Sequence, residues 1–221
     1  MTNTQTAGIS VILCCYNSSN KLEPTLQALA LQQLPMDLPC EIVLVDNAST
    51  DDTTARSIRI WQTLGSPYPL VTVSETQPGL IYARKKGLHT ATFPIVVFCD
   101  DDNRLAANYL HTAWQIMQEN PEIGILGGYA TPVSDQPLPE WFTTYQAYYA
   151  LGVQALNSGE VSADKIIWGA GMVMRKSVYS YLETIGFVGI MQDQTGKKLW
   201  SGGDAGTATN SPYNTTYPKN D

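Results

Sequence analysis

The sequence predicts an α/β fold with a mostly parallel sheet that is covered by helices on both faces. Two observations carry this prediction. Short apolar runs, which indicate buried strands, alternate with segments in which apolar residues recur at helical spacing. This order of strand and helix is repeated over about the first 130 residues, which favours parallel strands joined by helical crossovers.

The first two strands are expected at 9–14 and 40–45, where most residues are apolar. A helix is expected between them because Leu22, Leu26 and Leu29 recur at helical spacing.

The next helix follows the cluster Ser-Thr-Asp-Asp at 49–52, whose side chains are typical of helix N-termini. Its apolar face is expected to contain Ala55, Ile58 and Leu64, and a third strand is expected at 70–73.

The remaining elements of the sheet are a helix at 79–91, a strand at 95–99, a further helix and a fifth strand at 123–129. Asn120-Pro121 stops that last helix, since the residue before a proline disfavours the helical conformation. Its pattern consists of Leu110, Ala113, Trp114 and Met117.

The character of the chain changes after residue 130. Residues 131–160 are rich in Pro, Tyr and Trp and indicate a loop with a short helix, and a helical pattern returns at 176–185. Residues 205–221 show neither helical nor strand periodicity and are expected to be an irregular tail, like the polar residues 1–8.

Composition narrows the possible partners. The net charge of −7 and the pI near 4.7 argue against nucleic acid, which requires clustered Lys and Arg. The four cysteines lack a C-x-x-C spacing and are expected to be buried reduced thiols in a cytosolic protein. No stretch of 18 apolar residues is present, so no transmembrane segment is expected.

Polar residues follow three of the predicted strands: Tyr16-Asn17, Asp46-Asn47 and the triplet Asp100–Asp102. Ligands of parallel sheets bind at the carboxyl ends of the strands. In an extended backbone Asp100 and Asp102 point one way and Asp101 the other, which gives an Asp-x-Asp pair suited to a hard divalent cation. The triplet alone leaves open a second interpretation, a solvated acidic turn that caps the next helix.

Further along the chain, Gly79 opens a predicted helix, and Arg84 within it is suited to a phosphate or to orienting a strand-end carboxylate. Trp168 and Gly169 belong to a Trp-Gly-Ala-Gly run that permits sugar stacking and close backbone approach, although a buried strand is an equal alternative. Asp204 follows a glycine pair and is a candidate general base.

Together these segments, from about residue 9 to 204 and in the same order, resemble the family 2 glycosyltransferases, which are inverting enzymes of the GT-A fold. The resemblance implies one domain at 9–204, with a nucleotide-binding half at 9–130 and an acceptor-side half at 131–204.

The resemblance also implies roles. Asp46 would contact the nucleobase of a nucleotide-diphosphate sugar, with Tyr16 and Asn17 nearby. Asp100 would contact the ribose or the metal, Asp102 would hold Mn²⁺ or Mg²⁺ on the diphosphate, and Asp204 would deprotonate the acceptor hydroxyl. The remaining residues assigned to donor binding are Asn47, Gly79, Arg84, Asp101, Trp168 and Gly169.

The implied reaction moves a sugar, with a UDP-sugar as the preferred donor, to a glycan or lipid-linked acceptor in polysaccharide or glycoconjugate synthesis. The expected location is cytoplasmic, either free or peripheral at the inner membrane face.

The segment after Asp204 departs from the family pattern and resembles a truncated or altered end. This leaves a second hypothesis, a non-catalytic remnant that binds nucleotide diphosphate and metal. A nicotinamide-dependent dehydrogenase is disfavoured because no Gly-x-Gly-x-x-Gly follows the first strand.

Overall fold

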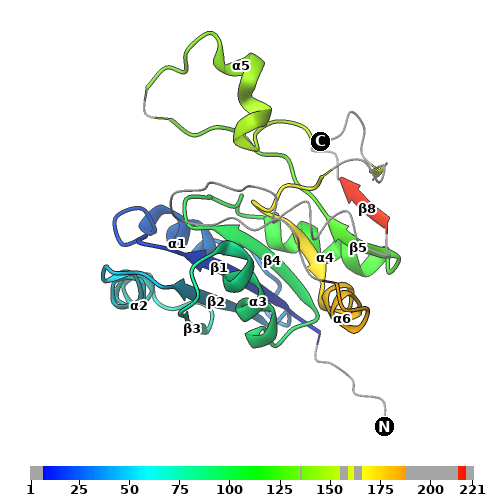
Figure 1. The fold of residues 1–221 in the computed structure, drawn as a ribbon, viewed down its shortest axis with the longest axis horizontal. Helices are drawn as coiled ribbons and strands as arrows, with labels where there is room; N and C mark the ends of the chain where they lie inside the picture. The colour runs from blue at the N-terminus through cyan, green and yellow to red at the C-terminus, as the bar shows by residue number, and fades with distance from the viewer. Residues whose placement is uncertain (1–6, 135, 155–158, 162–165, 188–213, 218–221) are drawn as a thin grey trace.

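The computed structural model describes residues 7–134, 136–154, 159–161, 166–187 and 214–217. In this part of the chain eight strands form one sheet, in the order β3-β2-β1-β4-β7-β5-β8-β6 (Figure 1). The strands are β1 Ile9–Cys15, β2 Cys40–Asn47, β3 Leu70–Glu75, β4 Ile95–Asp100, β5 Ile123–Leu126, β6 Gly159–Glu160, β7 Val173–Arg175 and β8 Asn214–Tyr217.

The strands β3, β2, β1 and β4 are all parallel, as the alternation of strand and helix predicts. Beyond β4 the sheet is mixed, because β7 runs antiparallel to both β4 and β5. The sequence order reverses at β1, since β2 lies on one side of it and β4 on the other. The carboxyl edge of β1 is therefore the switch point at which open α/β sheets bind ligands.

Helices cover both faces of the sheet, as predicted. The helices are α1 Glu23–Ala30, α2 Thr53–Thr63, α3 Leu80–Thr90, α4 Tyr109–Glu119, α5 Phe142–Tyr145, α6 Lys176–Thr184 and the 3₁₀ helix η1 Gln146–Tyr149. Val11 and Leu13 of β1 pack into one core with α1, α2 and α4, whereas Ile12 packs into a second core with α3 and α6. Alternate side chains of a strand point to opposite faces, so one apolar run supplies both cores.

The predicted apolar face of α2 is wrong in part. Ala55 and Ile58 are exposed, and the buried side of the helix is formed by Thr53, Ser57 and Trp61. Trp61 determines this rotation, since its ring is buried and its indole N–H donates to the Tyr68 carbonyl at 2.9 Å.

Two predicted boundaries also change. The fifth strand ends at Leu126 rather than at residue 129, before the pair Gly127-Gly128. The tail that was expected to be irregular contains β8, which pairs in parallel with β5. The edge of β5 offers backbone hydrogen-bonding groups to a neighbouring strand, and the sequence of the tail alone does not reveal this pairing. Threonine and tyrosine, which are frequent in the tail, also favour strands.

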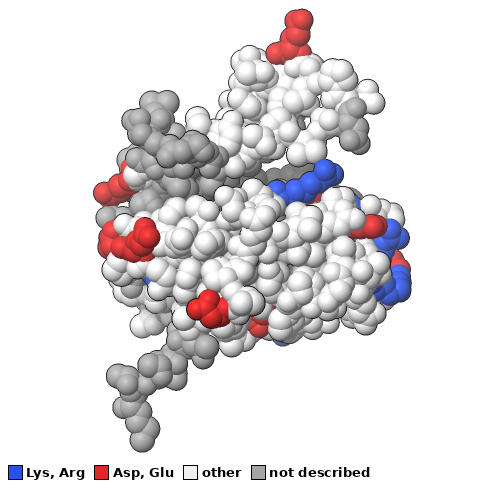
Figure 2. Space-filling view, turned by 180° about the vertical axis from the view of Figure 1, so that it is seen from behind, with Lys and Arg blue, Asp and Glu red and all other residues white. Residues whose placement is uncertain are grey.

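Lys and Arg side chains on the face drawn in Figure 2 lie in a few separate groups rather than in one extended basic surface. Among the described residues no helix has both the length and the apolar composition that a membrane crossing needs.

Candidate functional site

The polar residues predicted at the strand ends lie along one edge of the sheet. In the register of the parallel strands, Asp46 is opposite Cys15 and Asp100 is opposite Cys14. The loops after β2 and β4 therefore flank the end of β1 on its two sides. The sequence prediction of a shared edge is confirmed for these three loops.

The loop after β1 is joined to the loop after β2 by hydrogen bonds. The Asn17 N–H donates to the Ser49 hydroxyl at 3.0 Å, and the Asn17 side-chain oxygen accepts from the Thr50 N–H at 2.8 Å. Asn17 itself has a φ of 49°, a left-handed conformation that asparagine tolerates better than most residues. Asn17 therefore shapes the edge of the site, while the neighbouring Tyr16 ring is 43% exposed.

Asp46 lies at the end of β2 and orders the loop that follows it. Its two carboxylate oxygens accept hydrogen bonds from the Ser49 N–H at 3.1 Å and the Thr54 hydroxyl at 2.6 Å. An ionised carboxylate has about four acceptor positions, so these bonds leave capacity for a ligand. The carboxylate is thus held in place at the surface of the edge.

Asn47 is buried and holds the start of α3. Its amide donates to the Gln77 carbonyl at 2.7 Å, and its side-chain oxygen accepts from the Gly79 N–H at 2.8 Å. Gly79 has a φ of 134°, which only glycine adopts readily. Both residues therefore shape the backbone at this edge.

Arg84 of α3 is buried beneath the edge. Its guanidinium carbon lies 5.3 Å from the centre of the Phe98 ring, in the geometry of a cation–π contact. Burial raises the pKa of the Cys14 thiol to about 12, Arg84 opposes this rise and Asp100 adds to it. Arg84 and Asp100 therefore both lie near the same thiol behind the site.

The acidic triplet divides into two parts. Strand β4 ends at Asp100, and Asp101 and Asp102 form a turn in which the Asn103 N–H donates to the Asp100 carbonyl at 3.1 Å. Asp100 and Asp102 line a cavity, whereas the buried Asp101 carboxylate turns away to accept from the Ser18 hydroxyl. The division was predicted from strand alternation, but a turn rather than an extended chain produces it.

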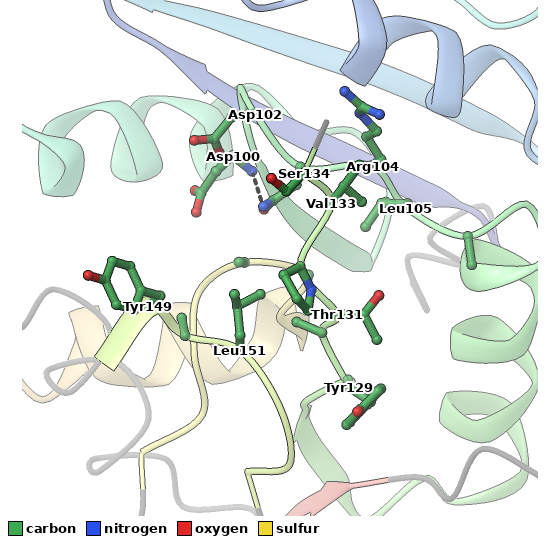
Figure 3. A pocket seen from close by; sticks show the side chains of 18 of the residues that line it. Asp100, Asp102, Arg104, Leu105, Tyr129, Thr131, Val133, Ser134, Tyr149 and Leu151 are labelled. Carbon is green, nitrogen blue, oxygen red and sulfur yellow. Dashed lines mark hydrogen bonds between the residues drawn. The ribbon is translucent and has the colours of Figure 1, made fainter. Parts of the chain in front are cut away.

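The cavity beside Asp100 and Asp102 has a volume of about 730 Å³. Figure 3 shows the two carboxylates on one side of it, with Tyr149 and Leu151 across from them. Its walls also include residues 103–106 and Tyr109, the segment 128–134, and Ala170 and Gly171. A volume of this size is typical of a site for a small-molecule ligand.

The Trp-Gly-Ala-Gly run contributes the floor of the cavity. Gly171 has a φ of 80°, and a Cβ there would lie 3.0 Å from the Tyr109 hydroxyl, so a glycine is needed. Trp168 is half-buried, and its backbone N–H donates to the Gln154 side-chain oxygen at 2.6 Å. Gly169 accepts from the Met172 N–H at 3.1 Å. The cavity contacts Ala170 and Gly171 rather than the two residues that the sequence indicated.

The pair Asp100 and Asp102 fits a divalent cation. Both carboxylates face the same cavity, and oxygen atoms are the ligands that Mn²⁺ and Mg²⁺ prefer. The exposed Asp102 has no hydrogen bond or ion pair to another described residue. Within the described ranges no three His, Cys, Asp or Glu side chains are grouped as metal ligands, so the remaining ligands would come from a bound molecule or water.

Asp204, the candidate base, lies outside the described residues. The sequence did not indicate the wall opposite the acidic pair, to which residues 128–134, Leu138, Phe142 and 149–151 contribute. The richness of this part of the chain in Tyr, Trp and Pro was visible, but its place beside Asp102 depends on the folded chain.

Comparison with known proteins relates the chain to sugar-transferring enzymes. The model of a family described as glycosyl transferase family 2 matches residues 10–182. A glucosyl-dolichyl phosphate glucuronosyltransferase of Haloferax volcanii is 23% identical over 194 residues, which cover 86% of this chain and 58% of that protein. The uncharacterised glycosyltransferase YfnE of Bacillus subtilis is 32% identical over 114 residues, 51% of this chain and 27% of that protein.

Solved structures show the same fold. Residues 1–349 of TarS of S. aureus in complex with UDP superpose with a TM-score of 0.67 at 19% identity, covering 97% of this chain and 58% of that one. The mannosyltransferase PcManGT from Pyrobaculum calidifontis, in complex with GDP-Man and Mn²⁺, gives 0.65 at 23% identity, covering 96% and 55%. The α/β fold is therefore of the GT-A type. The chain spans 58% or less of the length of each of these proteins.

Proposed function

This chain belongs to glycosyl transferase family 2, and we propose from that premise that it transfers a sugar from a nucleotide-diphosphate donor to an acceptor hydroxyl with inversion. The observation that carries the proposal is the pair of carboxylates, Asp100 and Asp102, which face one cavity at the carboxyl edge of the parallel strands. The buried Asp101 anchors the turn between them through Ser18 and Lys21.

The nucleoside part of the donor is assigned to the nucleotide-binding half, residues 9–130. The fixed Asp46 carboxylate would accept a hydrogen bond from the base, and the exposed Tyr16 ring would lie against it. Asn17, Asn47 and Gly79 support this surface through the loop contacts described above. The resemblance to proteins bound to UDP or GDP-Man supports a nucleotide sugar, and we propose a UDP-sugar as the preferred donor.

The diphosphate would lie beside Asp100 and Asp102, which would hold Mn²⁺ or Mg²⁺. When bound, the cation neutralises the charge that develops on the departing nucleoside diphosphate. The buried Arg84 suits the support of the acidic edge better than direct contact with a phosphate.

The acceptor would enter through the half that follows residue 130. Asp204 is proposed to take the proton of the acceptor hydroxyl, whose oxygen then bonds to the anomeric carbon as the bond to the diphosphate oxygen breaks. Trp168 and Gly169 lie behind the cavity floor and would shape the sugar subsite through Ala170 and Gly171. A role in polysaccharide or glycoconjugate synthesis with a glycan or lipid-linked acceptor is part of the same proposal.

Release of UDP from UDP-sugars in the presence of Mn²⁺ tests the activity directly. The full chain should release UDP from at least one of a panel of UDP-sugars, and Asp204→Asn should abolish release while leaving the binding of UDP unchanged. The surface variant Asp37→Asn, far from the proposed base in the sequence, serves as the matched control. UDP binding without any release would instead favour a non-catalytic nucleotide-binding remnant, and full activity of Asp204→Asn would remove Asp204 as the base.

A further inference from the structure

Five aromatic residues lie close together in the sequence, in a segment at the far side of the cavity. Trp141, Phe142, Tyr145, Tyr148 and Tyr149 lie on α5 and η1 or at the start of α5, and Figure 1 shows this segment standing away from the sheet. We call these five residues the aromatic arm. Their exposure is unusual, because Trp141, Tyr145 and Tyr149 are at least half exposed and Tyr148 is 87% exposed. A group of large exposed aromatic rings indicates a surface for binding.

The arm is a folded unit with a tied base. The Gly152 N–H donates to the Ala130 carbonyl at 2.7 Å, which closes the excursion that contains the arm. The side chain of Gln154 donates to the Gly128 carbonyl at 2.6 Å and accepts from the Trp168 N–H at the same distance. The base of the arm is therefore joined to the Trp-Gly-Ala-Gly segment that forms the cavity floor.

The helical spacing presents the rings in a continuous row. Trp141 immediately precedes α5, Tyr145 ends it and Tyr148 lies on η1, so the three residues follow one another at intervals of four and three positions. The ring centres of Trp141 and Tyr145 are 6.4 Å apart, and those of Tyr145 and Tyr148 are 6.3 Å apart. Such a row offers several neighbouring flat apolar faces, with hydroxyl and indole groups at their edges.

The row continues into the cavity. The rings of Phe142 and Tyr149 are 5.6 Å apart, and both residues line the cavity that Asp100 and Asp102 face. One end of the arm and the acidic pair therefore border the same cavity.

Charge decides which class of molecule fits. Residues 129–154 contain no Lys or Arg, and their only charged residues are Asp135 and Glu140. Figure 2 likewise shows the projecting lobe without blue side chains on the face that it presents. Helices that bind anionic membrane surfaces carry Lys and Arg on their polar face, so a phospholipid surface is disfavoured.

We propose that the aromatic arm binds a neutral carbohydrate chain, the acceptor of the proposed transfer, by stacking sugar rings on Trp141, Tyr145 and Tyr148. The apolar faces of sugar rings match flat aromatic faces, and their hydroxyl groups match the Tyr and Trp edges. That the bound carbohydrate is the acceptor of a transfer rests on the proposed function. The inference assigns neutral carbohydrate chains as the substrate class of the acceptor-side half.

An array of immobilised neutral oligosaccharides, made of four to six gluco-, manno-, galacto- or N-acetylglucosamine units, tests the assignment with the fluorescently labelled full chain. The wild-type chain should be retained on at least one of them, and Trp141→Ala/Tyr145→Ala/Tyr148→Ala should weaken retention at least about tenfold, as loss of a central aromatic contact does. Tyr145→Phe/Tyr148→Phe, which keeps the rings, should remain bound. The matched control Tyr181→Ala removes an aromatic ring of similar exposure from α6 and should bind like the wild type.

Three results would overturn the assignment: no retention of the wild type on any oligosaccharide, equal retention of the triple variant, or cosedimentation with phosphatidylglycerol vesicles that the triple substitution abolishes. Binding of UDP with Mn²⁺, measured on the same preparations, keeps the two proposals apart. The triple variant should bind UDP like the wild type, whereas a wild-type chain that binds oligosaccharides but not UDP would contradict the proposed transferase and leave the carbohydrate surface in place.

Discussion

Lys21 Nζ lies 2.8 Å from Asp101 Oδ1, and this ion pair joins the loop after β1 to the acidic triplet after β4. The other carboxylate oxygen of Asp101 accepts from the Ser18 hydroxyl, and its backbone carbonyl accepts from the Thr25 hydroxyl at 3.0 Å. The middle aspartate is therefore an anchor. It fixes the turn from which Asp100 and Asp102 face the cavity.

Replacement of the anchor should cost stability. Asp101→Asn removes the charge that pairs with Lys21 and disturbs the buried bond to Ser18, so we expect the free energy of unfolding to fall by about 1–3 kcal/mol. Urea denaturation at pH 7 measures it. Asp102→Asn is the matched variant: this exposed side chain forms no hydrogen bond or ion pair with a described residue, and its substitution should change the free energy of unfolding by less than about 0.5 kcal/mol. Equal losses in the two variants would contradict the division of the triplet.

Close packing of α3 on the sheet should make Gly87 intolerant of alanine. A Cβ at this position would lie 2.3 Å from Ile12 Cγ2 in the buried second core. Alanine normally favours a helix over glycine, but the overpacking should lower the free energy of unfolding by about 1–3 kcal/mol. Lys85→Ala, at an exposed position of the same helix, provides the comparison in a thermal or urea melt. A stabilised Gly87→Ala would show that helix and strand are further apart than the structure has them.

Asp51 should contribute a pH-dependent stability. Burial alone would raise the pKa of its carboxyl, but hydrogen bonds from Thr53 and Ser19 lower this pKa to about 2. A carboxyl in an unfolded chain has a pKa of about 3.9. Because the folded pKa is the lower one, the contribution is complete above about pH 4 and is lost as the pH falls through about 2.

The comparison of wild type with Asp51→Asn tests this. The variant should be less stable by under about 1 kcal/mol at pH 6, since the group is exposed and screened by solvent. The difference between the two proteins should shrink between pH 4 and pH 2. A gap of constant size over that range would rule out the hydrogen bonds to Asp51 as its source.

The thiols should be unreactive in the folded protein. All four cysteines are free, and burial raises the pKa of Cys14 and of Cys40 to about 12 and that of Cys15 and Cys99 well above the usual value. At pH 8 the thiolate fraction at a pKa of about 12 is roughly 10⁻⁴, so reaction with Ellman's reagent should be slow. In denaturing urea all four should react within minutes. One fast thiol in the folded state would identify a cysteine that is misplaced in the core.

The strands and the shared polar edge were predictable from sequence because they depend on local patterns. A mostly apolar run such as residues 40–45 indicates a strand whose two faces are both covered by helices, and the ends of the run indicate the ends of the strand. The face of α2 was not predictable in this way. Thr53 and Ser57 are buried because their hydroxyls find partners nearby, and the hydropathy of a residue does not reveal that.

Long-range contacts explain what the sequence missed in the site. Asn47 was predicted at the nucleotide from its place after a strand, whereas its hydrogen bond from the Gly79 N–H, 32 residues away, could not be predicted from that pattern. Ser18 and Asp101 are 83 residues apart, and no pattern links them. The aromatic arm was visible as a Tyr- and Trp-rich loop, whereas its place opposite Asp102 results from the return of the chain at Gly152.

The central claim is that Asp100 and Asp102 hold a divalent cation that binds a nucleoside diphosphate, and calorimetric titration of UDP, with GDP in parallel, tests it most directly. We expect saturable binding of at least one nucleotide in Mn²⁺ or Mg²⁺, its loss in EDTA, and an affinity at least about tenfold lower in Asp102→Asn at unchanged stability. Binding that persists in EDTA or in Asp102→Asn, or no binding of either nucleotide in the presence of either metal, would contradict the account.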